Sequence, residues 1–385
     1  MKNANRSVLG IGACLLLLLL ALAGCSSDSS SDNPTDNSGL PADPGAGNLA
    51  GIVYGTVSGQ PLAGVAVSAN GISTTTDSAG VFRLNGVGTG TMGVAISGNA
   101  VYARTAAVNT ATARSVRLDA IETSSGFNLA FYREIARGNE PTERNIYPTH
   151  RWTNSTPLTV YIDTDASATL DGVISQNQID TVRSVITQII PVFTGNFYTS
   201  VTIKTQPFTR LDFNRDIPDN AFVISFDDSL MSLGAFGITE TDPDFVSPAI
   251  SSINKAIVRL VDQSSFYTRG GITFEEVLAH ESGHGFGFRH TSNILPSVML
   301  RLGAFGGLYS DADRLHMAIV YKRPSGNADI DNDPIPGAKM VGEQIGRQIF
   351  IDRRANFPLA PELLARVRAL PSKIPRELLE QVSTH

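Results

Sequence analysis

Cysteine is scarce in this chain of 385 residues, which contains only Cys14 and Cys25. Cys14 lies in an apolar run, Val8–Leu22, that follows two basic residues. The run is shorter than the roughly 20 residues of a membrane-spanning helix and is typical of a secretory signal peptide, which we place at residues 1–24. Once this peptide is removed one cysteine remains. That excludes an intrachain disulfide and a latent form blocked by a further thiol.

The residues that end the apolar run predict where the protein is located. Leu22-Ala23-Gly24-Cys25 resembles a bacterial lipobox, in which the cysteine is lipidated and becomes the mature N-terminus. The resemblance implies a lipid anchor at Cys25 in a membrane of the cell envelope. Ser26 is not the residue that retains lipoproteins in an inner membrane, so the outer membrane is favoured, on its periplasmic or its surface face. The alternative is a plain signal peptide with an incidental cysteine.

Basic side chains are also in the minority, since 30 Lys and Arg face 36 Asp and Glu, giving a formal net charge of −6. The sequence has no basic stripe and no cluster of basic and aromatic residues. Nucleic acid is therefore excluded as a partner. Nothing in the sequence predicts a second subunit, and we expect a monomer.

Two changes of composition follow the signal peptide. Residues 25–48 consist mainly of Ser, Asp, Pro, Gly and Asn, which predicts a flexible tether behind the lipidated cysteine. Residues 49–122 alternate short β-branched runs with Gly, Asn and Asp turns, which predicts an all-β antiparallel sandwich. The turns at Pro61–Val65 and Asp77–Phe82 resemble those of the carboxypeptidase regulatory-like, transthyretin-type β-sandwich. We interpret this part as a rigid spacer; the alternative is a module that binds a glycan or a protein partner.

Histidine is rare as well, but three of the six histidines lie in one run, His280-Glu281-Ser282-Gly283-His284-Gly285-Phe286-Gly287-Phe288-Arg289-His290. His280 and His284 lie one turn apart on the same helix face, so both imidazoles can bind one cation. Gly287 can adopt the backbone conformation that ends a helix, and the turn brings in His290 as third ligand. Glu281 is placed to take a proton from a water at the open fourth position. The run predicts a catalytic Zn²⁺ site.

This run resembles the zinc-binding motif of the metzincin metalloendopeptidases. In that family a tight turn with a methionine below the metal follows the ligand helix, and Pro296-Ser297-Val298-Met299-Leu300 is similar to that turn, with Met299 as its methionine. The resemblance implies an α+β zinc protease domain of the matrix-metalloprotease type, which we place at residues 150–323. Its expected parts are a twisted mixed sheet, a long helix, the zinc helix, the methionine turn and a C-terminal helix.

The hydrophobic pattern places the elements of this domain. Helices are predicted at 179–193 and at 311–321. A third helix, which carries the histidine run, is predicted to begin at a capping box formed by Thr273 as N-cap and Glu276. Strands are predicted at 158–162, 201–204, 221–226, 234–239 and 255–261. By resemblance, an antiparallel edge strand pairs with the backbone of an extended substrate. Ala235, Phe236 and Gly237 are the candidates for that strand.

Residues 123–149 join the two domains. The spacing of apolar residues predicts an amphipathic helix from Phe127 to Arg137. We interpret the segment as a plain linker. The alternative is a pro-segment that covers the cleft and brings a carboxylate to the zinc, with Glu134, Glu140 and Glu143 as candidates.

Three features lie outside the resemblance. Arg301 stands two residues after the methionine, where some metzincins have a tyrosine. Asp329-Ile330-Asp331-Asn332-Asp333 begins like a calcium loop, but Pro334 and Met340 replace the required glycine and glutamate. We therefore interpret it as an acidic surface loop, and a structural Ca²⁺ has no support. Residues 324–385 form a C-terminal extension that we expect to pack against the catalytic domain.

Together these features predict a membrane-anchored, zinc-dependent endopeptidase that cleaves extended protein segments, with Glu281 as general base. One alternative is a surface adhesin that uses the metzincin fold as a scaffold, although a scaffold has no need of Glu281. The other is a hydrolase of non-peptide amides, which the candidate substrate strand disfavours because that strand would pair with a peptide backbone.

Overall fold

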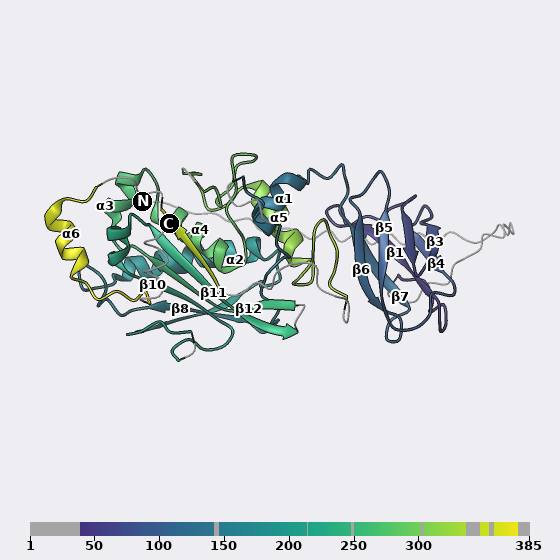
Figure 1. Cartoon of the computed structure of the whole chain (residues 1–385), viewed down its shortest axis with the longest axis horizontal. Coiled ribbons are helices and arrows are strands. Elements are labelled where there is room, and N and C mark those ends of the chain that lie inside the picture. Colours follow the sequence, from purple (N-terminus) through teal and green to yellow (C-terminus); the bar gives the residue numbers. More distant parts are fainter. Residues whose placement is uncertain are drawn as a thin grey trace, which may run out of the picture. The chain divides into compact units, whose positions relative to one another are not determined.

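The computed structural model describes residues 39–141, 146–213, 215–247, 250–301, 304–335, 347–353 and 358–375 (Figure 1). The predicted signal peptide, Cys25, most of the predicted tether, Glu143 and Met340 lie outside the described residues. The described residues all belong to one compact unit, Thr35–His385. Among them no helix has the length and apolar character needed to cross a membrane.

Seven strands without an intervening helix form the first part of the chain. They are β1 (Leu49–Gly55), β2 (Ala66–Ala69), β3 (Ile72–Thr75), β4 (Val81–Leu84), β5 (Thr91–Ser97), β6 (Arg104–Asn109) and β7 (Ser115–Ala120). They form a three-stranded sheet in the order β4-β1-β7 and a four-stranded sheet in the order β3-β2-β5-β6. Alternate residues of β5 are buried, as expected where one face of a strand meets a core. Both sheets contribute to one hydrophobic cluster, which includes Val53, Val67, Phe82 and Val94.

One pairing in this part differs from the predicted antiparallel arrangement. Strand β1 pairs with β7 in parallel, with Ala50 opposite Ser115 and Gly55 opposite Ala120. Local hydrophobic alternation is the same for parallel and antiparallel neighbours, so the sequence pattern carries no signal for this choice.

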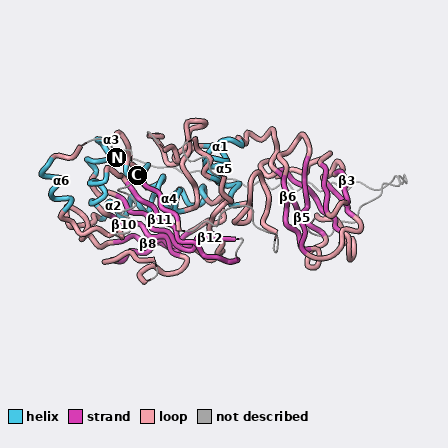
Figure 2. The backbone as a smooth tube through the Cα atoms, in the orientation of Figure 1, coloured by secondary structure: helices cyan, strands magenta, loops and turns pink. Residues whose placement is uncertain are grey.

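The second part contains a six-stranded mixed sheet in the order β13-β11-β12-β10-β8-β9. Figure 2 labels four of its strands, β8, β10, β11 and β12. Strands β8, β9, β10 and β12 run parallel to their neighbours in this group, whereas β11 is antiparallel to both β12 and β13. The strands are β8 (Leu158–Asp163), β9 (Val201–Gln206), β10 (Ala221–Phe226), β11 (Gly237–Ser247), β12 (Ile250–Leu260) and β13 (Gln348–Asp352).

Both faces of this sheet are covered. All six residues of β10 are buried, which is typical of a central strand with a core on either side. Ile224 and Val258 face the larger core, which includes the apolar faces of the helices, whereas Val223 and Ile257 face a smaller core with Phe208 and neighbouring loop residues. Strand β10 therefore lies between the two hydrophobic cores of the second part.

The helices are α1 (Leu129–Arg137), α2 (Gln176–Phe193), α3 (Ser264–Gly270), α4 (Phe274–Gly285), α5 (Asp311–Tyr321) and α6 (Pro361–Arg368), with a 3₁₀ helix, η1 (Asp228–Leu233). Helix α2 has a complete capping box at Ser175 and buries its apolar stripe, which includes Val182, Ile186 and Ile189. Helix α4 packs against α2 and against strands β11 and β12. This contact places the predicted zinc helix across the sheet.

The structure confirms that the chain combines helices with several β-sheets, and the predicted helices at 179–193 and 311–321 correspond to α2 and α5. The predicted helix from Phe127 to Arg137 corresponds to α1, which begins after its N-cap Asn128. Strand β13 was not predicted, and it matters here because it lies next to the site.

Candidate metal centre

Helix α4 begins and ends at well-defined caps. The Thr273 hydroxyl accepts from the backbone N–H of Glu276, but the Glu276 carboxylate accepts from the N–H of Phe305 instead of completing the predicted capping box. The helix ends at Gly285, whose carbonyl accepts from the indole N–H of Trp152, the only tryptophan of the chain, at 2.9 Å.

Gly287 follows the helix end with φ of +96°, in the region that glycine favours. A Cβ at this position would lie 1.8 Å from the carbonyl oxygen of His150, so a side chain is excluded by contact as well as by conformation. This turn carries the chain from α4 to His290.

Burial lowers the pKa of His150 to about 4, and the positive charge of Arg289 acts in the same direction, so the His150 imidazole is neutral.

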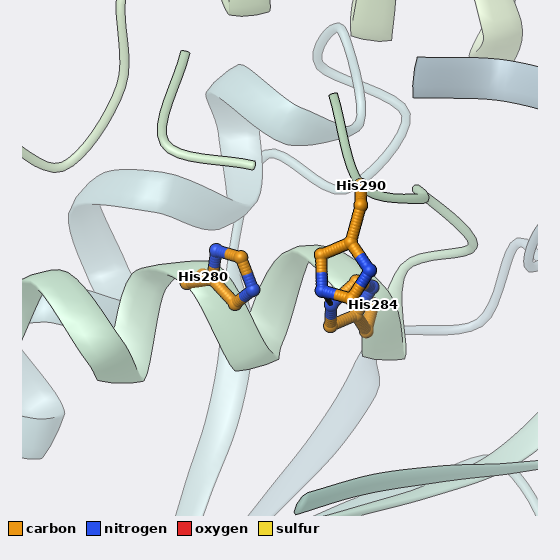
Figure 3. Close-up of side chains that lie close together, drawn as sticks. All are labelled: His280, His284 and His290. Carbon is orange, nitrogen blue, oxygen red and sulfur yellow. Dashed lines mark hydrogen bonds between the residues drawn. The ribbon is translucent and has the colours of Figure 1, made fainter. Parts of the chain in front are cut away.

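The turn brings His290 beside the two histidines of α4 (Figure 3). Each of His280, His284 and His290 offers a ring nitrogen, and these three nitrogens lie within 4.8 Å of one another. The Nε2 atoms of His284 and His290 are 3.2 Å apart. Two nitrogens bound to one tetrahedral zinc at about 2.0–2.1 Å would be about 3.3 Å apart. The donor set therefore fits a Zn²⁺ ion.

Backbone carbonyls fix the orientation of the two helical ligands. His280 Nδ1 lies 2.7 Å from the carbonyl oxygen of Val298, and His284 Nδ1 lies 2.8 Å from that of Phe288. A carbonyl oxygen can only accept, so each Nδ1 carries the proton and each Nε2 keeps its lone pair for a metal. In both rings Nε2 is therefore the atom available to a metal.

Glu281 lies between α4 and strand β11. The Thr239 hydroxyl donates to its carboxylate and also lies 2.9 Å from its main-chain carbonyl oxygen. Gly237 leaves the space for this side chain, since a Cβ there would lie 2.6 Å from Glu281 Cγ. Glu281 is 0% exposed. Sequence analysis did not identify Thr239, because its role depends on β11 crossing beneath α4.

Met299 lies under the helix, fully buried. A Cβ at Gly283 would lie 2.3 Å from the Met299 sulfur, so the glycine of the histidine run allows this close approach. The carboxylate of Asp313, on α5, accepts from the Ser297 hydroxyl at 2.5 Å and from the backbone N–H of Val298 at 2.9 Å. Asp313 therefore holds the turn whose carbonyl orients His280. It was not predicted.

The predicted substrate strand is not an edge of the sheet. Gly237 begins β11, and Ala235 and Phe236 precede it, both fully buried. The Phe236 ring stacks with Tyr267 inside the core. Strand β13, from the C-terminal extension, pairs with the outer side of β11. The prediction that this strand is exposed was wrong, because the extension supplies a sixth strand whose short sequence gave no signal.

Strand β13 brings two side chains to the histidines. The ring of Phe350 stacks on His284 with centroids 4.1 Å apart and planes at 1°. A carboxylate oxygen of Asp352 lies within 4.8 Å of a His280 ring nitrogen and a Glu281 carboxylate oxygen. His280 and His284 are 1% exposed and His290 8%. The site is therefore closed in this structure.

The carboxylates proposed for a pro-segment lie elsewhere. Glu134 accepts from the backbone N–H and hydroxyl of Ser292, at 2.8 and 2.7 Å. Glu140 pairs with Arg301 at 3.3 Å. Helix α1 thus packs as part of the second core, and the described residues of the joining segment bring no carboxylate into the histidine cluster.

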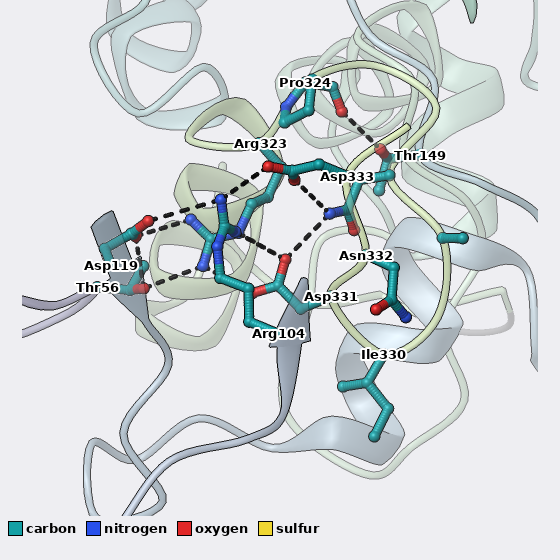
Figure 4. A network of polar contacts seen from close by, with 12 residues as sticks. Thr56, Arg104, Asp119, Thr149, Arg323, Pro324, Ile330, Asp331, Asn332 and Asp333 are labelled. Atoms are coloured by element: carbon teal, nitrogen blue, oxygen red, sulfur yellow. Dashed lines mark hydrogen bonds and ion pairs between the residues drawn. The ribbon is translucent and has the colours of Figure 1, made fainter. Parts of the chain in front are cut away.

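The acidic loop 329–333 is not a surface loop, contrary to our interpretation (Figure 4). Asp331 is 2% exposed and pairs with Arg104 of β6 at 2.9 Å and with Arg323 at 2.7 Å. Arg323 also pairs with Asp119 of β7, at 2.7 Å. The acidic residues therefore bind arginines between the first part of the chain and the second. The burial of the loop depends on ion pairs between residues more than 200 positions apart, Arg104 with Asp331 and Arg323 with Asp119, which local sequence does not reveal.

The rest of the extension packs against the second part, as expected. Lys373 Nζ lies 2.7 Å from the buried Asp163 carboxylate, and the Lys373 backbone N–H donates to Asp227 at 2.8 Å. Helix α6 contacts η1, with Val367 fully buried.

No protein-family model matches the sequence, and no curated protein matches it.

Proposed function

We propose that this protein is a zinc-dependent endopeptidase of the metzincin type. The observation that carries the proposal is the set of three imidazoles whose ring nitrogens lie within 4.8 Å of one another. Backbone carbonyls orient two of the rings, and the facing nitrogens of His284 and His290 have the spacing of two zinc ligands. His280, His284 and His290 would hold the ion. Zn²⁺ there would supply positive charge that activates water and polarises a substrate carbonyl.

Glu281 is the general base in this proposal. It takes the proton of the attacking water and delivers it to the leaving amine. The Thr239 hydroxyl holds its carboxylate, and the burial of both side chains keeps bulk water away from the proton transfer. A metal scaffold used only for binding needs the three ligands but has no use for a carboxylate held beside them, which favours the enzyme over the adhesin.

The substrate is an extended polypeptide segment in this proposal. Strand β11 runs past Glu281 at Gly237 and Thr239, and its outer side makes backbone hydrogen bonds to a neighbouring strand. A substrate segment would add to β11 in the same way, which brings a peptide carbonyl to the base. We further propose that the enzyme is a lipoprotein anchored through Cys25 in the cell envelope, with the first seven strands as a spacer.

Cleavage of a mixed set of proteins, followed by mass spectrometry of the products, tests the activity. The zinc-loaded full chain is compared with the double variant Phe350→Ala/Asp352→Ala, because β13 covers the histidines. We expect cleavage that a chelator and Glu281→Gln abolish, whereas Glu275→Gln, an exposed residue of the same helix, leaves it intact. Folded, zinc-loaded samples that cut no protein in either background would contradict the proposal and favour the adhesin.

A further inference from the structure

Strand β13 occupies the position that a substrate segment needs. It pairs antiparallel with β11 over five residues, from Gly237 opposite Asp352 to Thr241 opposite Gln348. The backbone N–H of Phe236 donates to the carbonyl of Asp352 at 2.9 Å, which extends the pairing beyond the start of β11. A second peptide cannot form the same hydrogen bonds while β13 is present.

The side chains of β13 divide by alternation into an inner and an outer row. Phe350 and Asp352 are buried and lie at the histidines, whereas Ile349 and Ile351 are only half-buried. Successive side chains of a strand point to opposite faces, so Phe350 and Asp352 lie on the same face, toward the histidines. The two inner side chains thus lie where the side chains of a bound peptide would lie.

Asp352 adds charge to this arrangement. Its carboxylate is 3% exposed and lies near Glu281, another buried carboxylate, and near His280. Two neighbouring carboxylates repel each other unless a cation or a proton lies between them, and aspartate is an ordinary zinc ligand type. The side chain therefore lies in the part of the site where the base must meet water and substrate.

Other contacts hold the segment in place at its start. Arg347 pairs with Glu240 of β11, and Glu240 also pairs with the buried Arg259 of β12. These ion pairs add to the backbone pairing that anchors β13 to the sheet. The position of β13 therefore depends on several contacts and not only on the stacking of Phe350.

We infer that residues Arg347–Arg353 are an intramolecular inhibitor that binds β11 in the place of a substrate, with Phe350 against His284 and Asp352 beside Glu281. The inference rests on the proposed function. It makes the present structure a latent form, and it makes displacement of β13 from β11 a requirement for turnover. It also indicates that the groove accepts an extended segment with an aromatic side chain at the position facing His284.

Two measurements on the zinc-loaded full chain test the inference. The first compares the rate of cleavage by the wild type and by Phe350→Ala/Asp352→Ala, for which we expect an increase of about tenfold or more. The second measures binding of a fluorescein-labelled peptide with the sequence Arg347–Arg353 by anisotropy, for which we expect at least tenfold tighter binding to the double variant. Point variants are preferred to truncation, since removal of the C-terminus would also remove Lys373 from Asp163.

Two controls separate inhibition from loss of structure. Phe350→Tyr keeps the aromatic ring and should remain as latent as the wild type, and a scrambled peptide should not bind. A melting temperature of the double variant within a few degrees of the wild type, together with retained zinc, shows that the groove is still formed. If β13 only covers a sheet edge, the double variant gains neither cleavage nor peptide binding, which would overturn the inference.

The two readouts distinguish the inference from the function on which it rests. Equal cleavage and equal peptide binding by wild type and double variant leave an endopeptidase without this inhibitor. Peptide binding restricted to the double variant, with no cleavage by any sample, shows that β13 occupies the groove but contradicts the endopeptidase.

Discussion

The ring of Phe350 lies face to face with the imidazole of His284, with centroids 4.1 Å apart and planes at 1°. The contact joins a strand of the C-terminal extension to a predicted zinc ligand about 66 residues earlier in the chain. The Nδ1 atom of the same imidazole is held by the carbonyl oxygen of Phe288. His284 is thus fixed by a hydrogen bond and by a stacked ring, and it can be used to report on both.

The stacked ring has a spectroscopic consequence. The protons of an imidazole that faces an aromatic ring are shielded, so the His284 ring signals should lie upfield in the wild type and move downfield in Phe350→Ala. Phe350→Tyr should leave them in place. The measurement is a proton–nitrogen or proton–carbon spectrum of the histidine-labelled chain; signals that do not respond to Phe350→Ala would show that the two rings are apart in solution.

Loss of one imidazole should release the metal. His290→Ala should lower zinc affinity by more than about 100-fold, because removal of groups that merely orient ligands already costs about 10–100-fold. Zinc content after dialysis against a weak chelator gives the result. His316→Gln is the matched control, since His316 is a buried histidine whose Nε2 accepts from the backbone N–H of Asn128. Unchanged zinc content in His290→Ala would remove His290 from the ligand set.

The Thr239 hydroxyl donates to Glu281, the proposed base, so Thr239→Val should reduce kcat by about tenfold while zinc content and KM stay close to wild type. Valine keeps the shape of the side chain and removes only the donor. Thr239→Ser, which restores a hydroxyl, should recover most of the rate. Steady-state kinetics on a cleaved peptide measure this, and a variant with wild-type kcat would show that the contact is structural.

The fit between Gly283 and Met299 predicts a non-additive pair of variants. Gly283→Ala should destabilise the protein by about 1–3 kcal/mol, because the new methyl group would overlap the buried Met299 sulfur. This cost exceeds the gain of up to about 1 kcal/mol from replacing glycine in a helix. Met299→Ala removes the overlap, so the double variant should be less destabilised than the sum of the two. Urea unfolding of the four proteins tests this, and simple additivity would contradict the contact.

The stability of the chain should depend on the ionisation of Asp262. Burial raises the pKa of its carboxyl from 3.8 to about 7, and the negative charges of Asp228 and Asp171 act in the same direction. The folded state therefore keeps a proton that the unfolded state has released between pH 3.8 and about 7, and stability falls as the pH rises through that range.

Asp262→Asn cannot ionise and should raise the free energy of unfolding at pH 8 by about 1–2 kcal/mol. This is less than the full shift because the side chain is still partly solvated. At pH 4 the variant and the wild type should be nearly equal. Urea unfolding at both pH values measures the difference, with the exposed Asp180→Asn as control. A gain of the same size at both pH values would show that charge is not the cause.

The parts of the site that the sequence predicts are those set by short spacing. Two histidines four residues apart on a helix, and a glycine that the turn requires, bring three imidazoles together through local geometry alone. Thr239 reaches the site from a strand 42 residues before Glu281, and Asp313 from a helix 15 residues after Val298, so periodicity cannot find them. Strand β13 is harder still, since five residues with Pro and Gly nearby carry little strand signal.

Arg323 lies among three groups from the two parts of the chain, with Asp119 and Thr56 on one side and Asp331 on the other. Its side chain is fully buried, and burial raises the cost of leaving such a charge without its partners. If the seven-stranded part unfolded alone, this guanidinium and Asp331 would lose Asp119, Thr56 and Arg104 together. These contacts therefore couple the unfolding of the two parts, and we expect a substitution in either part to change the stability of both.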